Sequence, residues 1–148
     1  MGALCAKQFS THSSIILAGS NIERLESVKA ECENQDNIIL WVCDFANERE
    51  RIGANLLDLI VANDVVVDKF IHFAGVTKMT PIKTCTISIV DTIFNVNLFS
   101  AIEIIKTLLK KKNQNALENV IMISALYSER GNAGNSIYAA SKGAINSL

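Results

Sequence analysis

Short runs of consecutive apolar residues alternate along the chain with longer segments in which apolar and polar residues mix. Runs of this length and aliphatic composition are typical of strands buried on both faces. They predict four strands, at residues 14–18, 38–43, 65–73 and 120–123. The other segments predict helices at residues 3–9, 21–33, 48–62, 87–111 and 136–147. Such alternation predicts an α/β fold, a doubly wound parallel sheet with helices on both faces.

The segment at residues 87–111 differs from the other predicted helices. Its apolar residues lie on nearly every side of the helix instead of forming one stripe. A helix of this kind has to be covered from more than one direction. We expect its own sheet to cover one side, and a partner helix from a second copy of the chain to cover another.

The charge balance gives no strong attraction to nucleic acid or to an anionic membrane. The 148 residues include 14 basic and 15 acidic side chains, for a net charge of −1. The four cysteines form no C-x-x-C pair, so we expect neither a metal site nor a disulfide framework. Reduced thiols and the lack of a signal-peptide pattern indicate a cytoplasmic protein. We also expect no apolar run that approaches the length of a membrane span.

Small and polar residues follow the predicted strands. Gly19, Asp44, Gly75 and Ser124 each lie at the carboxyl end of one of the four. In open parallel sheets, ligands bind outside the carboxyl ends of the strands. The clustering therefore predicts a ligand site at this edge of the sheet, independently of any family.

A tyrosine and a lysine in the last predicted helix, Tyr138 and Lys142, are four residues apart. This spacing places both on one face, with Cβ atoms about 5–6 Å apart. A phenol titrates near 10 in water, and a fixed ammonium nearby favours the phenolate, so the two groups form a usable acid/base pair. Ala139, Ala140 and Gly143 are small enough to let a flat ligand lie against the helix. Most pairs with this spacing are solvated helix surface, and the spacing alone leaves that alternative open.

Four features match one family in order and spacing: Asp44 after the second strand, Phe73-Ala74-Gly75 where the family has Asn-Ala-Gly, Asn97 in the long helix, and Tyr138 with Lys142. With these features the chain resembles the short-chain dehydrogenase/reductase family over nearly its whole length. The resemblance implies a Rossmann-like fold, with a single dinucleotide-binding domain over residues 1–148.

The resemblance also implies that parts of the family's domain are missing. The family opens with a strand and a glycine-rich loop, and only the end of that loop is matched, at Met1-Gly2. The missing strand belongs in the middle of the sheet, between the strands at residues 14–18 and 65–73, so two strand edges would be left unpaired. The family's last strands are missing as well. We therefore expect a fragment of a longer chain or a truncated gene product.

The resemblance implies a role for each matched residue. Tyr138 would pass a proton to or from the substrate oxygen, and Lys142 would assist it and bind the nicotinamide ribose. Asn97 would hold a water molecule in a proton relay, and Asp44 would bind the adenine amine. Each has a structural alternative: Asn97 as a buried amide satisfied by backbone, Asp44 as a helix cap, and Gly75 as a turn. The implied cofactor contacts are Gly2, Ser20, Asn21, Asp44, Phe73, Ala74, Gly75, Tyr138 and Lys142.

One position departs from the family's pattern. The family's catalytic serine stands thirteen residues before the tyrosine, where this chain has Ala125. Ser124 is the candidate replacement, but a shift by one residue along a strand turns a side chain to the other face. It could serve only if the strand has already ended or carries a bulge. Losing one hydrogen-bond donor to a reacting oxygen lowers turnover by about 100- to 1000-fold, so we expect an impaired active site.

The end of the first predicted strand bears on the choice of cofactor. Enzymes that prefer NAD usually carry an acidic residue there for the ribose hydroxyls. This chain has Gly19-Ser20-Asn21 instead, without a carboxylate, which weakly favours NADP over NAD. The usual arginine for the 2′-phosphate is also missing, and Ser20, Asn21 or Arg24 would take its place.

These observations support three hypotheses. The first is an NAD(P)-dependent oxidoreductase that moves hydride between nicotinamide and a small-molecule carbonyl or secondary alcohol, with likeness to oxoacyl reductases and to sugar or steroid dehydrogenases. The second is a non-catalytic, truncated relative that acts as a dimerisation module, forming a homo-oligomer through the helix at residues 87–111 and the terminal helix. The third is another nucleotide-binding α/β protein in which Tyr138 and Lys142 are incidental.

Overall fold

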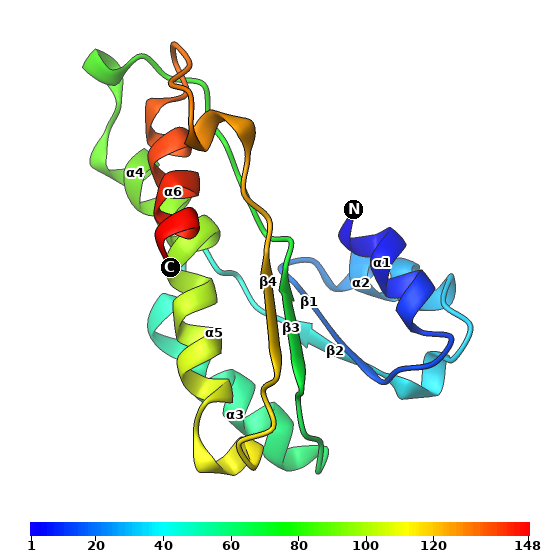
Figure 1. Ribbon diagram of the computed structural model, residues 1–148. Helices are drawn as coiled ribbons and strands as arrows, with labels where there is room; N and C mark the ends of the chain where they lie inside the picture. Colours follow the sequence, from blue (N-terminus) through cyan, green and yellow to red (C-terminus); the bar gives the residue numbers. More distant parts are fainter. The chain divides into compact units, whose positions relative to one another are not determined.

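The computed structural model describes residues 1–148 and divides into two compact units, Met1–Asp44 and Phe45–Leu148 (Figure 1). Each unit contains one pair of parallel strands together with helices. The predicted α/β class with parallel strands is therefore confirmed.

The first unit contains α1 (Gly2–Phe9), β1 (Ile15–Gly19), α2 (Ile22–Ala30) and β2 (Ile38–Val42). The two strands pair in parallel, with Ile15 opposite Ile38. The predicted start of α2 is confirmed because the Asn21 side chain caps it, its Oδ1 accepting a hydrogen bond from the Arg24 amide at 2.8 Å. A small core holds the unit together; its residues are Ala6, Cys32 and Ile38, with Ile15, Leu17, Val28 and Leu40 packed against them.

The second unit contains six elements: α3 (Ile52–Ala62), β3 (Lys69–His72), α4 (Ile87–Phe94), α5 (Ser100–Leu108), β4 (Asn119–Met122) and α6 (Ser136–Ser147). β3 and β4 pair in parallel, with Phe70 opposite Val120. Helices α3 to α6 lie to one side of this ladder (Figure 1), where α3 packs against α5 and α4 against α6. The carboxyl end of β3 and the start of α6 thereby belong to the same compact unit, which positions the candidate site.

β1 pairs only with β2, and β3 only with β4. Each ladder therefore has strand edges without a partner, as the sequence analysis predicted. The third strand is also shorter than residues 65–73, because only Lys69–His72 pair with a neighbour. The backbone of Val67 binds a side chain instead of a strand: its N–H donates to Asn113 Oδ1 at 2.7 Å and its carbonyl accepts from Asn113 Nδ2 at 2.8 Å.

The long helix predicted at residues 87–111 is interrupted. A π turn, Asn95–Phe99, separates α4 from α5, and the helix ends at Leu108. Within it, Ile93, Ile104 and Leu108 are at most 3% exposed. Since α3 and α6 pack on this segment, helices of the same chain already cover much of its apolar surface. Cover by a second copy of the chain stays a prediction.

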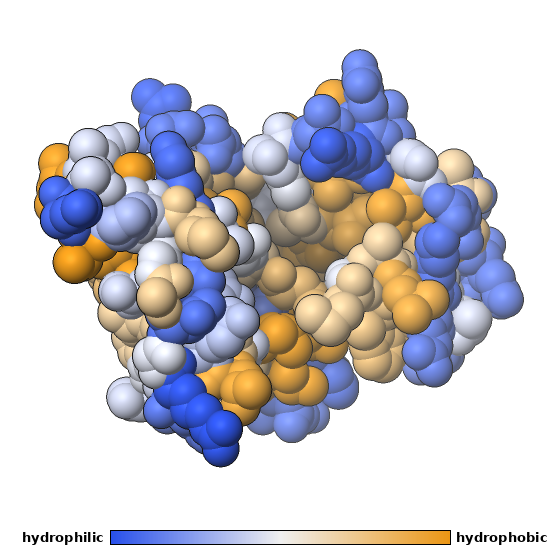
Figure 2. Space-filling model, turned by 90° about the horizontal axis from the view of Figure 1, so that it is seen from above, coloured by the Kyte–Doolittle hydropathy of each residue, from blue (hydrophilic) through white to orange (hydrophobic).

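The expectation that no apolar run approaches the length of a membrane span is wrong for Ile87–Leu108. This stretch has 22 residues, and an 18-residue window within it has a mean hydropathy of 1.4, which satisfies the length and composition of a span. The core helix of a globular protein can satisfy the same test, and 39% of the window is buried in the fold. Apolar side chains also reach the surface, as the orange areas of Figure 2 show; Met79 and Ile87 are each 74% exposed.

Candidate active site

Lys142 is the most deeply buried charged side chain of the candidate site. It lies on α6 and is only 4% exposed, and its Nζ donates a hydrogen bond to the Ile123 carbonyl at 2.6 Å. Burial lowers the pKa of Lys142 from its usual 10.5 because water no longer stabilises the ammonium. Tyr138, half-buried one turn earlier, has its ring centroid 6.0 Å from Nζ. The predicted shared helix face is confirmed, and the ammonium lies beside the end of β4.

Asn97 is fully buried in the π turn and binds two other segments. Its Oδ1 accepts from the Val76 N–H at 2.7 Å. Its Nδ2 donates to the Val76 carbonyl at 3.0 Å and to Ser141 Oγ at 2.9 Å. Both amide hydrogens are thus used within the protein, as the structural alternative predicted, and only Oδ1 keeps a lone pair for another donor. The predicted role of holding a water molecule therefore rests on that oxygen.

Gly75 lies where these two side chains meet. A Cβ atom at this position would stand 3.5 Å from Lys142 Nζ and 3.7 Å from Asn97 Oδ1. The backbone after β3 is therefore bare on the side that faces the ammonium and the amide. Lys142, Asn97 and Gly75 converge on one place, with Tyr138 on the neighbouring turn of α6.

Ser124 lies beyond the end of its strand. β4 stops at Met122, so the strand alternation that would turn Ser124 to the opposite face no longer applies. Its Oγ is 3.3 Å from the Lys142 carbonyl oxygen and 3.4 Å from Ser128 Oγ, and its single hydrogen can be donated to either. Ala125 follows in an extended conformation, with φ −151° and ψ 154°. Ser124 is thus directed toward α6, and its predicted catalytic role stays a prediction.

The predicted cofactor contacts fall in both units. Phe73, Ala74 and Gly75 follow β3 in the second unit, whereas Gly2, Ser20, Asn21 and Asp44 belong to the first. In the first unit, Gly2 begins α1, Ser20 is exposed directly after β1, Asn21 caps α2, and Asp44 is half-buried beyond β2.

Sequence reasoning missed two residues of this site. Ser141 is fully buried, and its Oγ accepts from Asn97 and donates to the Tyr138 carbonyl at 2.7 Å. His72, the last residue of β3, is 2% exposed, and its Nε2 is 3.2 Å from the Val96 carbonyl oxygen. The spacing of Ser141 on the helix carrying Tyr138 was a usable signal. For His72, the only signal in the sequence was its position directly before Phe73-Ala74-Gly75.

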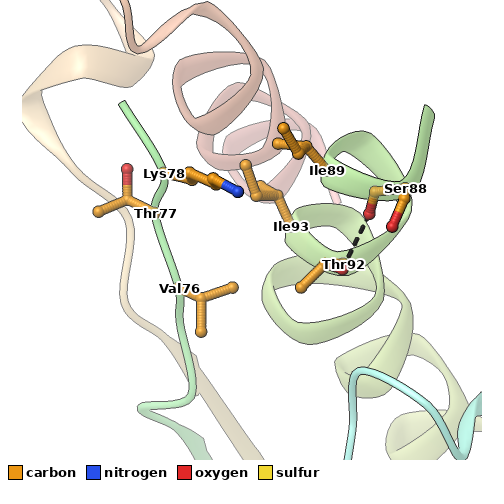
Figure 3. Close-up of a pocket in the computed structure, with 7 residues that line it drawn as sticks. All are labelled: Val76, Thr77, Lys78, Ser88, Ile89, Thr92 and Ile93. Atoms are coloured by element: carbon orange, nitrogen blue, oxygen red, sulfur yellow. Dashed lines mark hydrogen bonds between the residues drawn. The ribbon is translucent and has the colours of Figure 1, made fainter. Parts of the chain in front are cut away.

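A cleft of ≈ 290 Å³ opens beside the segment that Asn97 holds (Figure 3). It lies between the chain after Gly75 and α4, and the Lys78 side chain extends from that chain toward Ile93. On the opposite wall, Thr92 Oγ1 donates to the Ser88 carbonyl at 2.8 Å. The lining residues are Val76, Thr77, Lys78, Ser88, Ile89, Thr92 and Ile93.

Comparison with known families and curated proteins gives a consistent result. The family model for short chain dehydrogenases matches residues 1–148. The 3-oxoacyl-[acyl-carrier-protein] reductase of Rickettsia felis is 28% identical over 144 residues, which cover 97% of this chain and 56% of the relative. The ketoacyl reductase HetN of Nostoc sp. is 30% identical over 86 residues, or 57% of this chain and 30% of that protein. The chain therefore spans little more than half the length of the Rickettsia relatives it matches.

Solved structures share the fold. A short-chain dehydrogenase from Streptomyces avermitilis superposes with a TM-score of 0.83 at 22% identity, covering 99% of this chain and 52% of that one. An NAD⁺-bound xylitol dehydrogenase gives 0.83 at 18% identity, covering 99% and 56%. A serine dehydrogenase complexed with NADP⁺ gives 0.81 at 21% identity, covering 99% and 57%.

Proposed function

We propose that this chain, which belongs to the short chain dehydrogenase family, carries the proton-transfer and cofactor-binding residues of an NAD(P)-dependent oxidoreductase. The reaction would move hydride between nicotinamide and a carbonyl or secondary alcohol of a small molecule. The observation that supports this best is the convergence of the Lys142 ammonium and the Asn97 amide on the bare backbone of Gly75. Reductases of oxoacyl groups among the relatives favour a carbonyl substrate.

The residues present fit a nicotinamide nucleotide. Gly75 has no side chain between the backbone and the ammonium, so a ribose could approach both. Lys142 keeps donor capacity for ribose hydroxyls because Ile123 takes only one of its three hydrogens. When bound, the cofactor supplies or accepts the hydride. The Tyr138 hydroxyl would give a proton to the carbonyl oxygen as hydride reaches the carbon, or take it back in the reverse direction.

We propose that turnover is impaired by Ala125. A serine there would add a hydroxyl donor for the substrate oxygen, and its loss lowers turnover by about 100- to 1000-fold. Ser124 is a weak substitute because its hydroxyl is directed toward the Lys142 carbonyl and Ser128.

We propose a preference for NADP. No carboxylate follows β1 in Gly19-Ser20-Asn21, and Arg24 is exposed on the first turn of α2. The Asn21 oxygen is used in the helix cap, which leaves its NH₂ group to donate to a phosphate. Dissociation constants for NADPH and NADH test the preference, and tighter binding of NADH would contradict it.

Titration of the chain with NADPH, followed by nicotinamide fluorescence, tests the function. Binding should be observed, and Gly75→Val should weaken it at least tenfold by filling the space beside Lys142. Gly131→Val is the matched control, because a Cβ at Gly131 meets nothing within 4 Å. Absence of binding in the chain, or equal loss in both variants, would refute the proposal.

The second candidate function is a non-catalytic dimerisation module. It is favoured by Ala125 at the catalytic position and by the exposure of Ile87, Leu109 and Leu148, at 74%, 62% and 63%. A dimer in sedimentation that Ile87→Glu dissociates, together with no NADPH binding, would support this function instead of the first.

A further inference from the structure

The buried imidazole of His72 has a defined partner. Its Nε2 is 3.2 Å from the Val96 carbonyl oxygen, and the residue is 2% exposed. A carbonyl oxygen can only accept, so Nε2 must carry the hydrogen. Burial, and next the charge of Lys142, lower the pKa of His72 from its usual 6.5, so the ring is neutral near pH 7. In this state one nitrogen donates and the other does not, which fixes the tautomer.

The carbonyl that His72 binds belongs to the π turn. Here the helix hydrogen bonds shift by one residue, since the Ser100 N–H donates to Asn95. A side chain also binds within the turn, because the Val96 carbonyl accepts a second hydrogen bond from Ser100 Oγ at 2.8 Å. Single π turns inside α-helices frequently occur at functional sites. Two side chains, one from β3 and one from α5, thus hold the same carbonyl.

The peptide plane of Val96 leads directly into Asn97. The Asn97 amide in turn binds the backbone of Val76 and the hydroxyl of Ser141, which is next to Lys142. Hydrogen bonds, joined by the peptide bond between Val96 and Asn97, therefore connect the end of β3 through the π turn to α6.

We propose that His72 is a positioning residue, which fixes the Val96 peptide and so orients the Asn97 amide toward Val76 and Ser141. The proposal rests on the proposed function for its catalytic meaning, but the geometry it predicts is independent of activity. A side chain with a hydrogen-bond donor at the same depth should keep the Asn97 amide in this orientation, whereas a ring of similar size without a donor should not.

Two variants of the 148-residue chain test this. His72→Phe keeps a ring and removes the donor, and His72→Gln restores an N–H donor at a similar distance from the backbone. We expect His72→Phe to shift the NMR signals of the Asn97 side-chain amide and to weaken NADPH binding about three- to tenfold, the range for one lost hydrogen bond. His72→Gln should return both toward the starting values.

Thr107→Val is the matched control for general destabilisation. Thr107 is also 2% exposed and also donates to a helix carbonyl, that of Glu103 at 2.9 Å, but it has no bond to the Asn97 chain. This variant should leave the Asn97 signals in place. Unchanged Asn97 signals in His72→Phe, or equal shifts in Thr107→Val, would overturn the proposal.

The NMR readout separates the two proposals. If the unmodified chain binds neither NADPH nor NADH, the proposed function fails, while the Asn97 signals still decide whether His72 positions the amide. If NADPH binds and His72→Phe changes neither the signals nor the affinity, only the role of His72 fails.

Discussion

Two buried asparagines hold the two ends of the β3 segment in nearly the same way. Before the strand, Asn113 binds both the N–H and the carbonyl of Val67, at 2.7 and 2.8 Å. After the strand, Asn97 binds both groups of Val76, at 2.7 and 3.0 Å. The third hydrogen bond differs, because Asn113 donates to the Leu108 carbonyl and Asn97 to Ser141 Oγ. We call each asparagine, with its two bonds to one valine backbone, a clamp. The Asn113 clamp also binds the end of α5, and the Asn97 clamp also binds α6.

The surroundings distinguish the two clamps. Near Asn97 lie the buried Lys142 and His72, both with a lowered pKa, and the bare backbone of Gly75. The charged pair next to Val67 is Asp68 with Lys69, which is more than half exposed. A buried charge is available for chemistry, whereas an exposed pair is screened by water. A clamp thus becomes part of a candidate site through the ionisable groups beside it.

The largest effect, a gain in turnover, should come from adding a hydroxyl group to the candidate site at position 125. In a version of the chain extended by the segments that its relatives possess, Ala125→Ser should raise turnover with NADPH and a ketone by about 100- to 1000-fold. Ala116→Ser, also half-buried and near Asn113, is the control and should leave turnover unchanged. No gain from Ala125→Ser would mean that Ser124 or another donor already serves.

Removing either clamp should have the next largest effect. Asn97→Ala and Asn113→Ala each leave a part-buried backbone N–H and carbonyl without their partner, so each should lower the free energy of unfolding by about 2–4 kcal/mol in urea titrations. Only Asn97→Ala should also weaken NADPH binding under conditions where the variant is folded. Equal losses of affinity would remove the functional distinction between the two ends.

A carboxylate substituted at each clamp sharpens the comparison. Asn97→Asp places a negative charge near the buried Lys142 ammonium, whereas Asn113→Asp buries one whose neighbouring cations, Lys110 to Lys112, are exposed to water. Since an unpaired buried charge is strongly destabilising, Asn113→Asp should lower the unfolding midpoint more, by about 1–3 kcal/mol in free energy. The reverse order would contradict the assigned electrostatics.

Lower pH should destabilise the fold mainly through the end of the β3 segment held by Asn97, where His72 lies, and less through the end held by Asn113. The folded-state pKa of His72 is below its usual 6.5, so below this pH the unfolded chain binds more protons and stability falls as pH drops. The slope is at most about 1.4 kcal/mol per pH unit. Urea midpoints at pH 7.5 and 5.5 should differ less in His72→Gln, whereas Asp68→Asn should leave the difference unchanged.

The smallest effect on folding is expected at Gly75. A methyl group there makes only ordinary contacts, at 3.5 and 3.7 Å, so Gly75→Ala should change stability by less than about 1 kcal/mol. It should nevertheless weaken NADPH binding, because the methyl group narrows the approach to Lys142. A stability loss with unchanged affinity would make Gly75 a structural turn.

The sequence by itself determined the order of strands and helices, the helix start at Asn21 and the family's matching residues. These follow from local properties: aliphatic runs, side-chain caps and helical spacing act between residues that are close in the chain. The shared face of Tyr138 and Lys142 belongs to the same class, because four residues make about one helical turn.

Only the tertiary structure decided how the site is held. The bonds of Asn97 to Val76 and Ser141 join residues 21 and 44 positions apart, and that of His72 to Val96 spans 24. The π turn and the late start of β3 depend on such partners as well. Local sequence cannot specify them, because a buried polar group takes whichever donor or acceptor the packed fold brings within hydrogen-bonding distance.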